Sequence, residues 1–192
     1  MPQLSDEPLI TGELVIRRYR PDDAEKLVES VTESIEHLRP FMPWISFEPQ
    51  SVEQRRDFIN DCNANWDAGG DMVVVVFAGE KLVGGSGLHR RRGGPGLEIG
   101  YWIHVDYTGR GYATAVSARL TEAAFSLPET EYVEILHDKA NLASGRVPAK
   151  LGFEPIEEVA AEATSPDDSG VNCHWRITRH DFEARVAAGT WP

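Results

Sequence analysis

The residues best suited to chemistry lie in a glycine loop between a candidate strand and a candidate helix, Thr108-Gly-Arg-Gly-Tyr-Ala113. Gly109 and Gly111 allow the backbone to approach a ligand closely and to point successive N–H groups outward. A helix that starts near Gly111 adds a partial positive charge at its N-terminus, which favours a bound anion. The spacing therefore predicts a cradle for a pyrophosphate group.

Other phosphate-binding turns share part of this pattern. A Walker loop is excluded, because no Gly-Lys-Ser or Gly-Lys-Thr sequence follows. A dinucleotide-binding turn is the closer rival, since Gly109-x-Gly111 follows a strand and opens a helix. Its third glycine position holds Thr114, and the loop follows four candidate strands, so this alternative fails. When the loop is considered by itself, a tight turn that binds no ligand remains an alternative interpretation.

The elements that must position this loop follow from hydrophobic periodicity and turn residues. Strands are expected between turn signals over residues 9–18, 72–78, 81–88, 97–105, 132–137, 153–161 and 171–178. Helices are expected where caps and a helical period coincide, over residues 21–35, 51–68, 111–126, 142–151 and 180–188. This order predicts an α+β fold with a mostly antiparallel sheet and one parallel crossing in its second half.

Length and composition narrow the class of protein. The length of 192 residues suits one domain, predicted over residues 1–192. The net charge of −12 argues against nucleic acid as a partner, because phosphate binding needs a basic face. The longest apolar run, residues 72–78, is too short for a membrane span and the N-terminus lacks a signal pattern, so a cytoplasmic location is expected. Cys62 and Cys173 suggest neither a disulfide framework nor a metal site.

Three segments together carry a family resemblance. The stretch EIGYWIHVDYTGRGYATA (98–115), followed by NLASGRVPAKLGF (141–153), resembles the GNAT superfamily, and HLRPFMPWI (37–45) resembles its RimJ/RimL-type branch. The superfamily's usual Gln/Arg-x-x-Gly-x-Gly/Ala is met at 108–113, with Thr108 at the first position. The element order matches over residues 9–179. The resemblance implies a mixed sheet of six to seven strands flanked by about four helices, with a central V-shaped splay.

The resemblance also implies an enzyme, an N-acyltransferase that moves an acetyl or other small acyl group from acyl-CoA to an amine without a metal. The donor would be acetyl-CoA or another acyl-CoA such as succinyl-CoA. Backbone groups at His104 and Val105 would pair with the pantetheine arm as an added strand does. The splay between the strands ending at Val105 and His137 would admit this arm, and Asn141 would contact it. The pyrophosphate would lie on the amides of Gly109, Arg110, Gly111, Tyr112, Ala113 and Thr114, and candidates for the adenosine phosphates are Arg110, Arg119, Arg146 and Lys150.

Two residues are candidates for proton transfer. Glu98 resembles the glutamate that histone-acetylating superfamily members use as a base, and Glu134 on the neighbouring strand is the reserve. Many superfamily members use as general acid a tyrosine seven residues after the asparagine that corresponds to Asn141, but Pro148 occupies that position here. Ser144, in Asn-x-x-Ser, is then the donor expected near the sulfur. Pro148 also lacks an N–H, so a carbonyl near Ser144 is expected to lose its partner and the helix to kink.

The sequence defines the binding site for the amine acceptor less clearly. Phe41, Trp44 and Trp102 are expected to line the acceptor pocket, with Met42, His37 and His89 as further candidates. The acceptor is either a protein N-terminus, as the RimJ/RimL resemblance implies, or a small-molecule amine, and the protein could form a homodimer. A non-catalytic acyl-CoA-binding regulatory module is the alternative function, and a structural protein without a ligand is a third class.

Overall fold

The computed structural model describes residues 4–91 and 93–192, and its strands form one continuous sheet in the order β1-β2-β3-β4-β5-β6-β8-β7. The strands are β1 Leu9–Thr11, β2 Leu14–Arg18, β3 Met72–Ala78, β4 Lys81–His89, β5 Gly96–Ile103, β6 Tyr132–Asp138, β7 Glu154–Ala160 and β8 Val171–Thr178. Neighbouring strands are antiparallel except β5 and β6, which are parallel. The predicted sheet type and its single parallel crossing are confirmed.

The sheet has eight strands in the described part of the chain, whereas six to seven were expected. The reason lies in residues 9–18, which were expected to form one strand. Gly12 has φ +56°, a left-handed conformation that turns the chain back on itself. Leu9 therefore pairs with Ile16 in an antiparallel hairpin, and the predicted first strand becomes β1 and β2.

Five α-helices lie within the described residues, where the sequence pattern predicted five and the family resemblance implied about four. They are α1 Ala24–Leu38, α2 Val52–Asp67, α3 Tyr112–Ser126, α4 Leu142–Leu151 and α5 Arg179–Ala187. The capping box predicted at Ser51 is present: the amide of Gln54 donates to Ser51 Oγ at 3.2 Å, and the amide of Ser51 donates to Gln54 Oε1 at 2.8 Å. Gly152, with φ +72°, ends α4 as predicted. Local capping signals thus placed these helix ends correctly.

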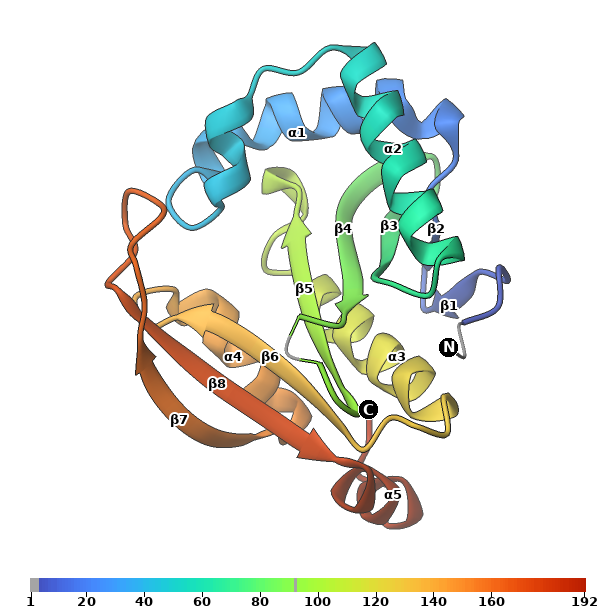
Figure 1. Cartoon of the computed structure of the whole chain (residues 1–192), viewed down its shortest axis with the longest axis vertical. Helices are drawn as coiled ribbons and strands as arrows, with labels where there is room; N and C mark the ends of the chain where they lie inside the picture. The colour runs from blue at the N-terminus through green and yellow to red at the C-terminus, as the bar shows by residue number, and fades with distance from the viewer. Residues whose placement is uncertain (1–3, 92) are drawn as a thin grey trace.

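The helices cover both faces of the first half of the sheet (Figure 1). α1 and α2 pack on one face, where Val75 and Phe77 join their hydrophobic cluster. α3 packs on the opposite face, where Val74 and Val76 join a second cluster. Alternating side chains of β3 thus enter two different cores, which is why this strand is apolar almost throughout.

The sheet opens between its two halves. β5 and β6 pair in register only from Gly96 opposite Tyr132 to Ile99 opposite Ile135. Both strands continue past this point, β5 to Ile103 and β6 to Asp138, and they diverge visibly in Figure 1. The V-shaped splay implied by the family resemblance is therefore present, and it separates a first sheet half that carries α1 to α3 from a second half that carries α4 and α5.

Candidate active site

The glycine loop forms an uncapped helix N-terminus. Gly109 and Gly111 have φ +73° and +82°, left-handed values at which residues with a Cβ are strained. α3 begins at Tyr112, directly after Gly111, and no side chain of the described residues caps it. The amides of its first turn therefore need another acceptor, and an anion at this position would supply one.

The basic side chains near the loop differ in their surroundings. Arg110 stacks on the ring of Tyr107, with 4.7 Å from its guanidinium carbon to the ring centre, and donates to the Asp106 carbonyl at 3.0 Å. Arg119 forms a 2.5 Å ion pair with Glu122 inside α3. Arg146 and Lys150 are exposed on α4. Arg110 is thus held beside the cradle, and the phosphate-binding roles of all four residues stay predictions.

The backbone after β5 is held more tightly than expected. The predicted strand over 97–105 ends at Ile103, and Val105–Tyr107 forms a turn of 3₁₀ helix. The amide of His104 donates to the Val83 carbonyl at 2.9 Å, and that of Val105 to Ser34 Oγ at 3.2 Å.

Strand pairing then decides which peptide groups face the splay. Because hydrogen-bonded and non-hydrogen-bonded pairs alternate in an antiparallel ladder, the bond from His104 to β4 directs the peptide groups of Tyr101 and Ile103 away from β4. They point toward the splay. Pairing of pantetheine with His104 and Val105 stays a prediction, and the geometry favours the peptide groups of Tyr101 and Ile103.

The His104 side chain anchors this strand end to α1. Its buried ring accepts a hydrogen bond from the Asp106 amide at Nδ1, over 3.1 Å, and its Nε2 lies 2.7 Å from Glu33 Oε2. An Nδ1 that accepts leaves the proton on Nε2, so the neutral ring donates to the carboxylate. The hydrogen bonds from His104 and then Lys81 hold the pKa of Glu33 below its ordinary value. The histidine thus fixes the turn that leads into the cradle.

A cavity of about 1000 Å³ passes through the splay. Alternate β5 side chains face its two ends, because successive residues of a strand point to opposite faces. Trp102 belongs to the cluster under α1 and α2, and Glu98 shares its face, whereas Tyr101 belongs to the cluster on the α3 side. Ser144 and Asn141 of α4 also line the cavity. One space therefore joins the predicted base, the predicted acid and the predicted pantetheine contact.

The two glutamates proposed from the sequence have different environments. Glu98 is 7% exposed, lines the cavity and lies 2.6 Å from Arg91 Nη1. Glu134, its register partner on β6, is buried outside the cavity lining and lies 2.7 Å from Arg176 Nη2. The geometry therefore favours Glu98 for chemistry and gives Glu134 a structural ion pair.

A histidine and aspartate pair lies beside Glu98. His89 is the register partner of Glu98 on β4, lines the cavity, and places its Nδ1 2.8 Å from Asp71 Oδ2. Burial raises the pKa of Asp71, but hydrogen bonds from the Arg90 amide and from His89 outweigh it and lower this pKa below its ordinary value. Asp71 was not predicted. The hairpin turn at Gly79-Glu80 was a partial signal, because by itself it places Asp71 opposite Leu88. A register shift between Val76 and Phe77 brings Asp71 opposite His89 instead.

Ser144 is held from two sides. Its amide donates to Asn141 Oδ1 at 3.1 Å, which is the cap predicted for this helix. Tyr101 Oη lies 2.9 Å from Ser144 Oγ and donates to the Ser144 carbonyl at 3.1 Å. Burial raises the pKa of Tyr101 to about 12, so the phenol keeps its proton at neutral pH. Tyr101 was not predicted as a site residue, although it stands in the quoted Glu-Ile-Gly-Tyr segment.

Aromatic side chains line the other end of the cavity. Trp44 and Trp102 meet edge to face with ring centres 6.1 Å apart, and Phe41 also lines the space. Phe47 at the rim is 73% exposed. The three residues predicted for the acceptor pocket therefore line one cavity, Phe41 and Trp44 from the proline-broken segment and Trp102 from β5.

The same cavity end is bounded by the loop between β7 and β8. The amide of Asp167 donates to the Pro40 carbonyl at 3.1 Å, which joins this loop to the segment after α1. Asp168 in the loop and Asp138 at the end of β6 line the cavity. Burial raises the pKa of Asp138, but hydrogen bonds from the backbone, first that of Ser169, lower it below its ordinary value. This end thus presents carboxylates as well as aromatic rings.

Comparison with known proteins decides the family. A family model described as an acetyltransferase (GNAT) domain matches residues 13–154. The chain is also 30% identical over 149 residues to YdaF, a candidate ribosomal N-acetyltransferase of Bacillus subtilis (strain 168), covering 75% of this chain and 79% of that protein. The chain belongs to the GNAT acetyltransferases. It is an enzyme that transfers an acetyl group from acetyl-CoA, as the sequence resemblance implied.

Solved acetyltransferases share the fold. RimL, a ribosomal L7/L12 α-N-protein acetyltransferase in complex with coenzyme A, has a TM-score of 0.82 at 15% identity over 91% of this chain and 99% of that chain. Mycobacterium smegmatis RimJ in complex with a CoA disulfide has a TM-score of 0.77 at 21% identity over 93% of this chain and 91% of that chain. The microcin C7 self-immunity acetyltransferase MccE, with acetyl-CoA and AMP, has a TM-score of 0.80 at 15% identity over 88% and 93%. These likenesses support the fold prediction.

The residues of this acetyltransferase fit acetyl-CoA. The α3 N-terminus offers uncapped amides at two left-handed glycines, and the splay leaves peptide groups of β5 without a β6 neighbour. Within residues 4–91 and 93–192, no group of three or more His, Cys, Asp or Glu residues is arranged to hold a metal ion. No helix in that part of the chain is both long and apolar enough to cross a membrane.

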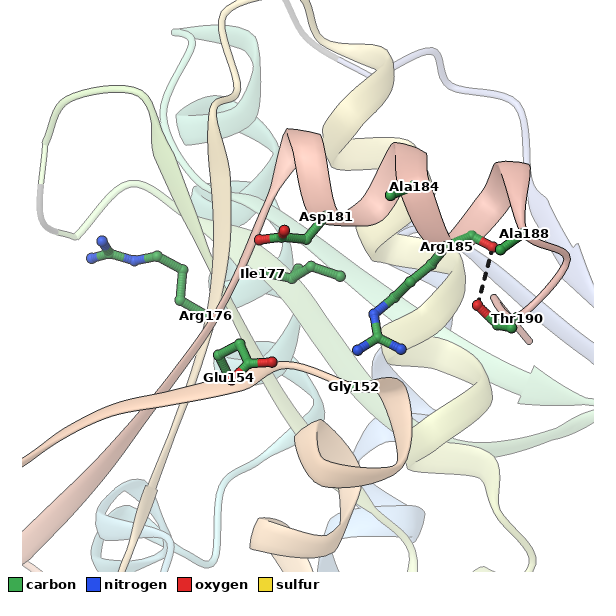
Figure 2. Close-up of a pocket in the computed structure, with 9 residues that line it drawn as sticks. All are labelled: Gly152, Glu154, Arg176, Ile177, Asp181, Ala184, Arg185, Ala188 and Thr190. Carbon is green, nitrogen blue, oxygen red and sulfur yellow. Dashed lines mark hydrogen bonds between the residues drawn. The ribbon is translucent and has the colours of Figure 1, made fainter.

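A second cavity of about 260 Å³ lies between α5 and the start of β7 (Figure 2). Figure 2 shows the Arg185 side chain reaching from α5 toward Gly152. The Arg185 backbone carbonyl accepts a hydrogen bond from Thr190 Oγ1 at 3.3 Å. Arg176, which also lines this cavity, is paired with Glu134. The cavity contains none of the residues of the glycine cradle or the splay, so we assign the acetyl-transfer site of this enzyme to the larger cavity.

Proposed function

We propose that this acetyltransferase modifies the α-amino group of a protein N-terminus. The observation that carries the proposal is the cavity of about 1000 Å³ that passes through the splay and joins Ser144 to Glu98 and Trp44. Its volume lies at the upper end for a small-molecule site. The exposed ring of Phe47 at its rim offers apolar surface to a peptide that continues outward. The descriptions of YdaF and RimL support a ribosomal protein as acceptor, which would place the reaction in the cytoplasm.

The chemistry of the acceptor also favours an α-amine. An α-amino group has a pKa of about 7.7–8.0 and a lysine side chain about 10.4. About a third of the α-amine is therefore neutral near pH 7.5, against roughly 0.1% of the lysine amine. The candidate base of this site is a carboxylate, which is a weak base. An α-amine loses its proton more readily than a lysine amine, so it suits such a base better.

Glu98 is the proposed base of the reaction. It lies on the cavity end that contains Trp44 and Trp102, so an amine entering past the aromatic wall reaches its carboxylate. The carboxylate attracts the ammonium form and takes up its proton, directly or through a water molecule, before attack. Asp138 and Asp168 extend the negative charge toward the cavity mouth. The arrangement thus concentrates a cationic acceptor where it must lose a proton.

Ser144 is the proposed partner of the leaving group. Acetyl-CoA supplies a thioester, whose C–S bond breaks as the new N–C bond forms. The Ser144 hydroxyl donates a hydrogen bond to the departing sulfur, and the thiolate takes its proton from solvent. The amine loses two protons through Glu98, one before attack and one as the N–C bond forms. Since the thiolate regains one, a single proton is released to solvent overall, and charges and protons balance. The amides after Gly109 and Gly111 hold the pyrophosphate, and Asn141 positions the first turn of α4.

The test compares acceptors by mass spectrometry. We would incubate the enzyme and acetyl-CoA with a peptide that has a free N-terminus and an internal lysine, with the same peptide blocked at its N-terminus, and with a polyamine. We expect acetylation at the N-terminal amine of the free peptide, and little on the blocked peptide or the polyamine. Acetylation of the polyamine or of the lysine at a higher rate would overturn the acceptor class and leave the acetyltransferase assignment intact.

A further inference from the structure

Pro148 creates a defect in α4 at the catalytic end of the splay. A helical residue donates its N–H to the carbonyl four residues earlier, which for position 148 is the carbonyl of Ser144. Proline has no N–H, so the usual helical hydrogen bond to this carbonyl is missing. Ser144 is only partly exposed, and a carbonyl without a partner in such a place destabilises the helix turn that contains it.

A phenol from the opposite arm of the splay fills this defect. Tyr101 Oη donates to the Ser144 carbonyl at 3.1 Å and also lies 2.9 Å from Ser144 Oγ. A phenol has one proton. Because that proton goes to the carbonyl, the Ser144 hydroxyl donates to the phenol oxygen while the cavity is empty, and its proton is free to turn to the sulfur once acetyl-CoA is bound. The two residues therefore form a closed pair of hydrogen bonds.

The pair bridges the two halves of the sheet. Tyr101 is on β5 past Ile99, where pairing with β6 has ended, and Ser144 is on the helix that follows β6. Together with the bond from the Ser144 amide to Asn141 Oδ1, the phenol fixes Ser144 from both of its ends.

We propose that Tyr101 is a positioning residue for acetyl transfer, which replaces the helical hydrogen bond that Pro148 cannot make and thereby holds the Ser144 hydroxyl at the floor of the cavity. The inference rests on the proposed role of Ser144 toward the leaving sulfur. Tyr101 itself takes no proton from the substrates. Its contribution is the position of the Ser144 oxygen, because a displaced Oγ would weaken the hydrogen bond that its proton makes to sulfur.

The experiment restores the missing amide. Tyr101→Phe removes the phenol oxygen, and Pro148→Ala returns an N–H opposite the Ser144 carbonyl. We expect Tyr101→Phe to lower kcat about tenfold with KM for acetyl-CoA nearly unchanged, because the lost contact matters in the transition state. Pro148→Ala by itself should leave kcat within about twofold of the wild-type value. The double variant should recover most of the loss, because the new amide takes over the carbonyl.

Three comparisons keep the outcome decisive. Tyr132→Phe, at the far end of β6, controls for loss of a tyrosine hydroxyl, and thermal unfolding with and without CoA checks that each variant folds and binds. An unchanged kcat in Tyr101→Phe, or a double variant as slow as Tyr101→Phe, would overturn the positioning role. Ser144→Ala distinguishes the proposed role of Ser144 from the proposed role of Tyr101. An unchanged kcat in Ser144→Ala would contradict both roles. A double variant without rescue would contradict only the role of Tyr101.

Discussion

Glu98 of β5 and Glu134 of β6 are direct neighbours in the parallel pairing, and each carboxylate has its own arginine, Arg91 for Glu98 and Arg176 for Glu134. Two carboxylates on one face of adjacent strands would repel each other if both arginines were absent. Glu98 faces the cavity and Glu134 lies outside its lining. The two residues are therefore neighbours in the sheet with different environments.

Glutamine substitutions should separate these roles. Glu98→Gln should lower kcat/KM for the acceptor by a factor of about a hundred or more, because the proposed base is lost, while the unfolding free energy changes little. Glu134→Gln should lower the unfolding free energy by about 1–3 kcal/mol and leave kcat/KM nearly unchanged, because it breaks a mostly buried ion pair. Steady-state kinetics and urea unfolding of both variants check this. The reverse pattern would give the base role to Glu134.

His89 offers a separate check on the base. If Glu98 is the base, His89→Gln should lower kcat/KM less than about tenfold, because the imidazole then only borders the amine. A loss as large as that of Glu98→Gln, shared by Asp71→Asn, would instead assign proton removal to the His89 and Asp71 pair. The measurement is kcat/KM for the acceptor, from steady-state rates at varied acceptor and saturating acetyl-CoA. Asp138→Asn serves as the control for loss of a cavity carboxylate outside this pair.

The cradle is tested by a glycine comparison. Gly111→Ala places a Cβ at φ +82° and should raise Kd for CoA at least about tenfold, because the strained residue shifts the amides of the α3 N-terminus. Gly79→Ala introduces a comparable strain, at φ +58°, in the hairpin turn between β3 and β4. It should lose stability without losing CoA affinity. Isothermal titration with CoA distinguishes them, and equal affinities in both variants would contradict the assigned cradle.

Local signals made much of the fold predictable from the sequence. The capping box at Ser51, the cap at Asn141 and the glycine loop each depend on residues within a few positions of one another. The hairpin within residues 9–18 was missed, although Gly12-Glu13 is itself a turn signal, because the flanking residues alternate as in one strand. Local sequence signals thus predicted where helices and strands lie, but missed a turn that divides one predicted strand into two.

The contacts that tune the site could not be read in the same way. The partners Tyr101 and Ser144 are 43 residues apart in sequence and meet across the splay. A carbonyl without a partner near Ser144 was expected from Pro148, but nothing near it in sequence indicates that Tyr101 supplies the donor. Likewise, the ion pair of Arg91 with Glu98 depends on how the loop between β4 and β5 folds back. Such pairs follow from strand register and side-chain length together.

The acceptor wall gives a further prediction. Trp44→Ala should raise KM for a peptide acceptor about tenfold and leave KM for acetyl-CoA unchanged, because the ring packs edge to face on Trp102 at the acceptor end of the cavity. Trp191→Ala, near the C-terminus, controls for loss of an indole. Initial-rate kinetics with each substrate varied in turn measure both constants. A change confined to the acetyl-CoA constant would move Trp44 to the donor side.

The last prediction concerns acid stability and depends on a carboxylate remote from catalysis. Asp23 is 5% exposed, receives both Arg17 guanidinium nitrogens at 2.7 Å, and accepts from the Arg20 amide at 2.7 Å. Burial raises the pKa of Asp23, but the hydrogen bonds from Arg17 and then Arg20 outweigh it and lower this pKa below its ordinary value. A lowered folded-state pKa stabilises the fold above the ordinary value and loses that effect as pH falls through the folded value.

Asp23→Asn should therefore lower the unfolding free energy by about 2 kcal/mol at pH 7, and the difference from wild type should shrink progressively below about pH 5. Asp22→Asn, at the exposed neighbouring position, should track the wild-type curve at every pH, because its carboxylate is exposed to water in the folded chain. Urea unfolding between pH 7 and pH 3 provides the curves. If the Asp23→Asn and wild-type curves stayed parallel down to pH 3, the Arg17 pair would not be a source of the protein's acid sensitivity.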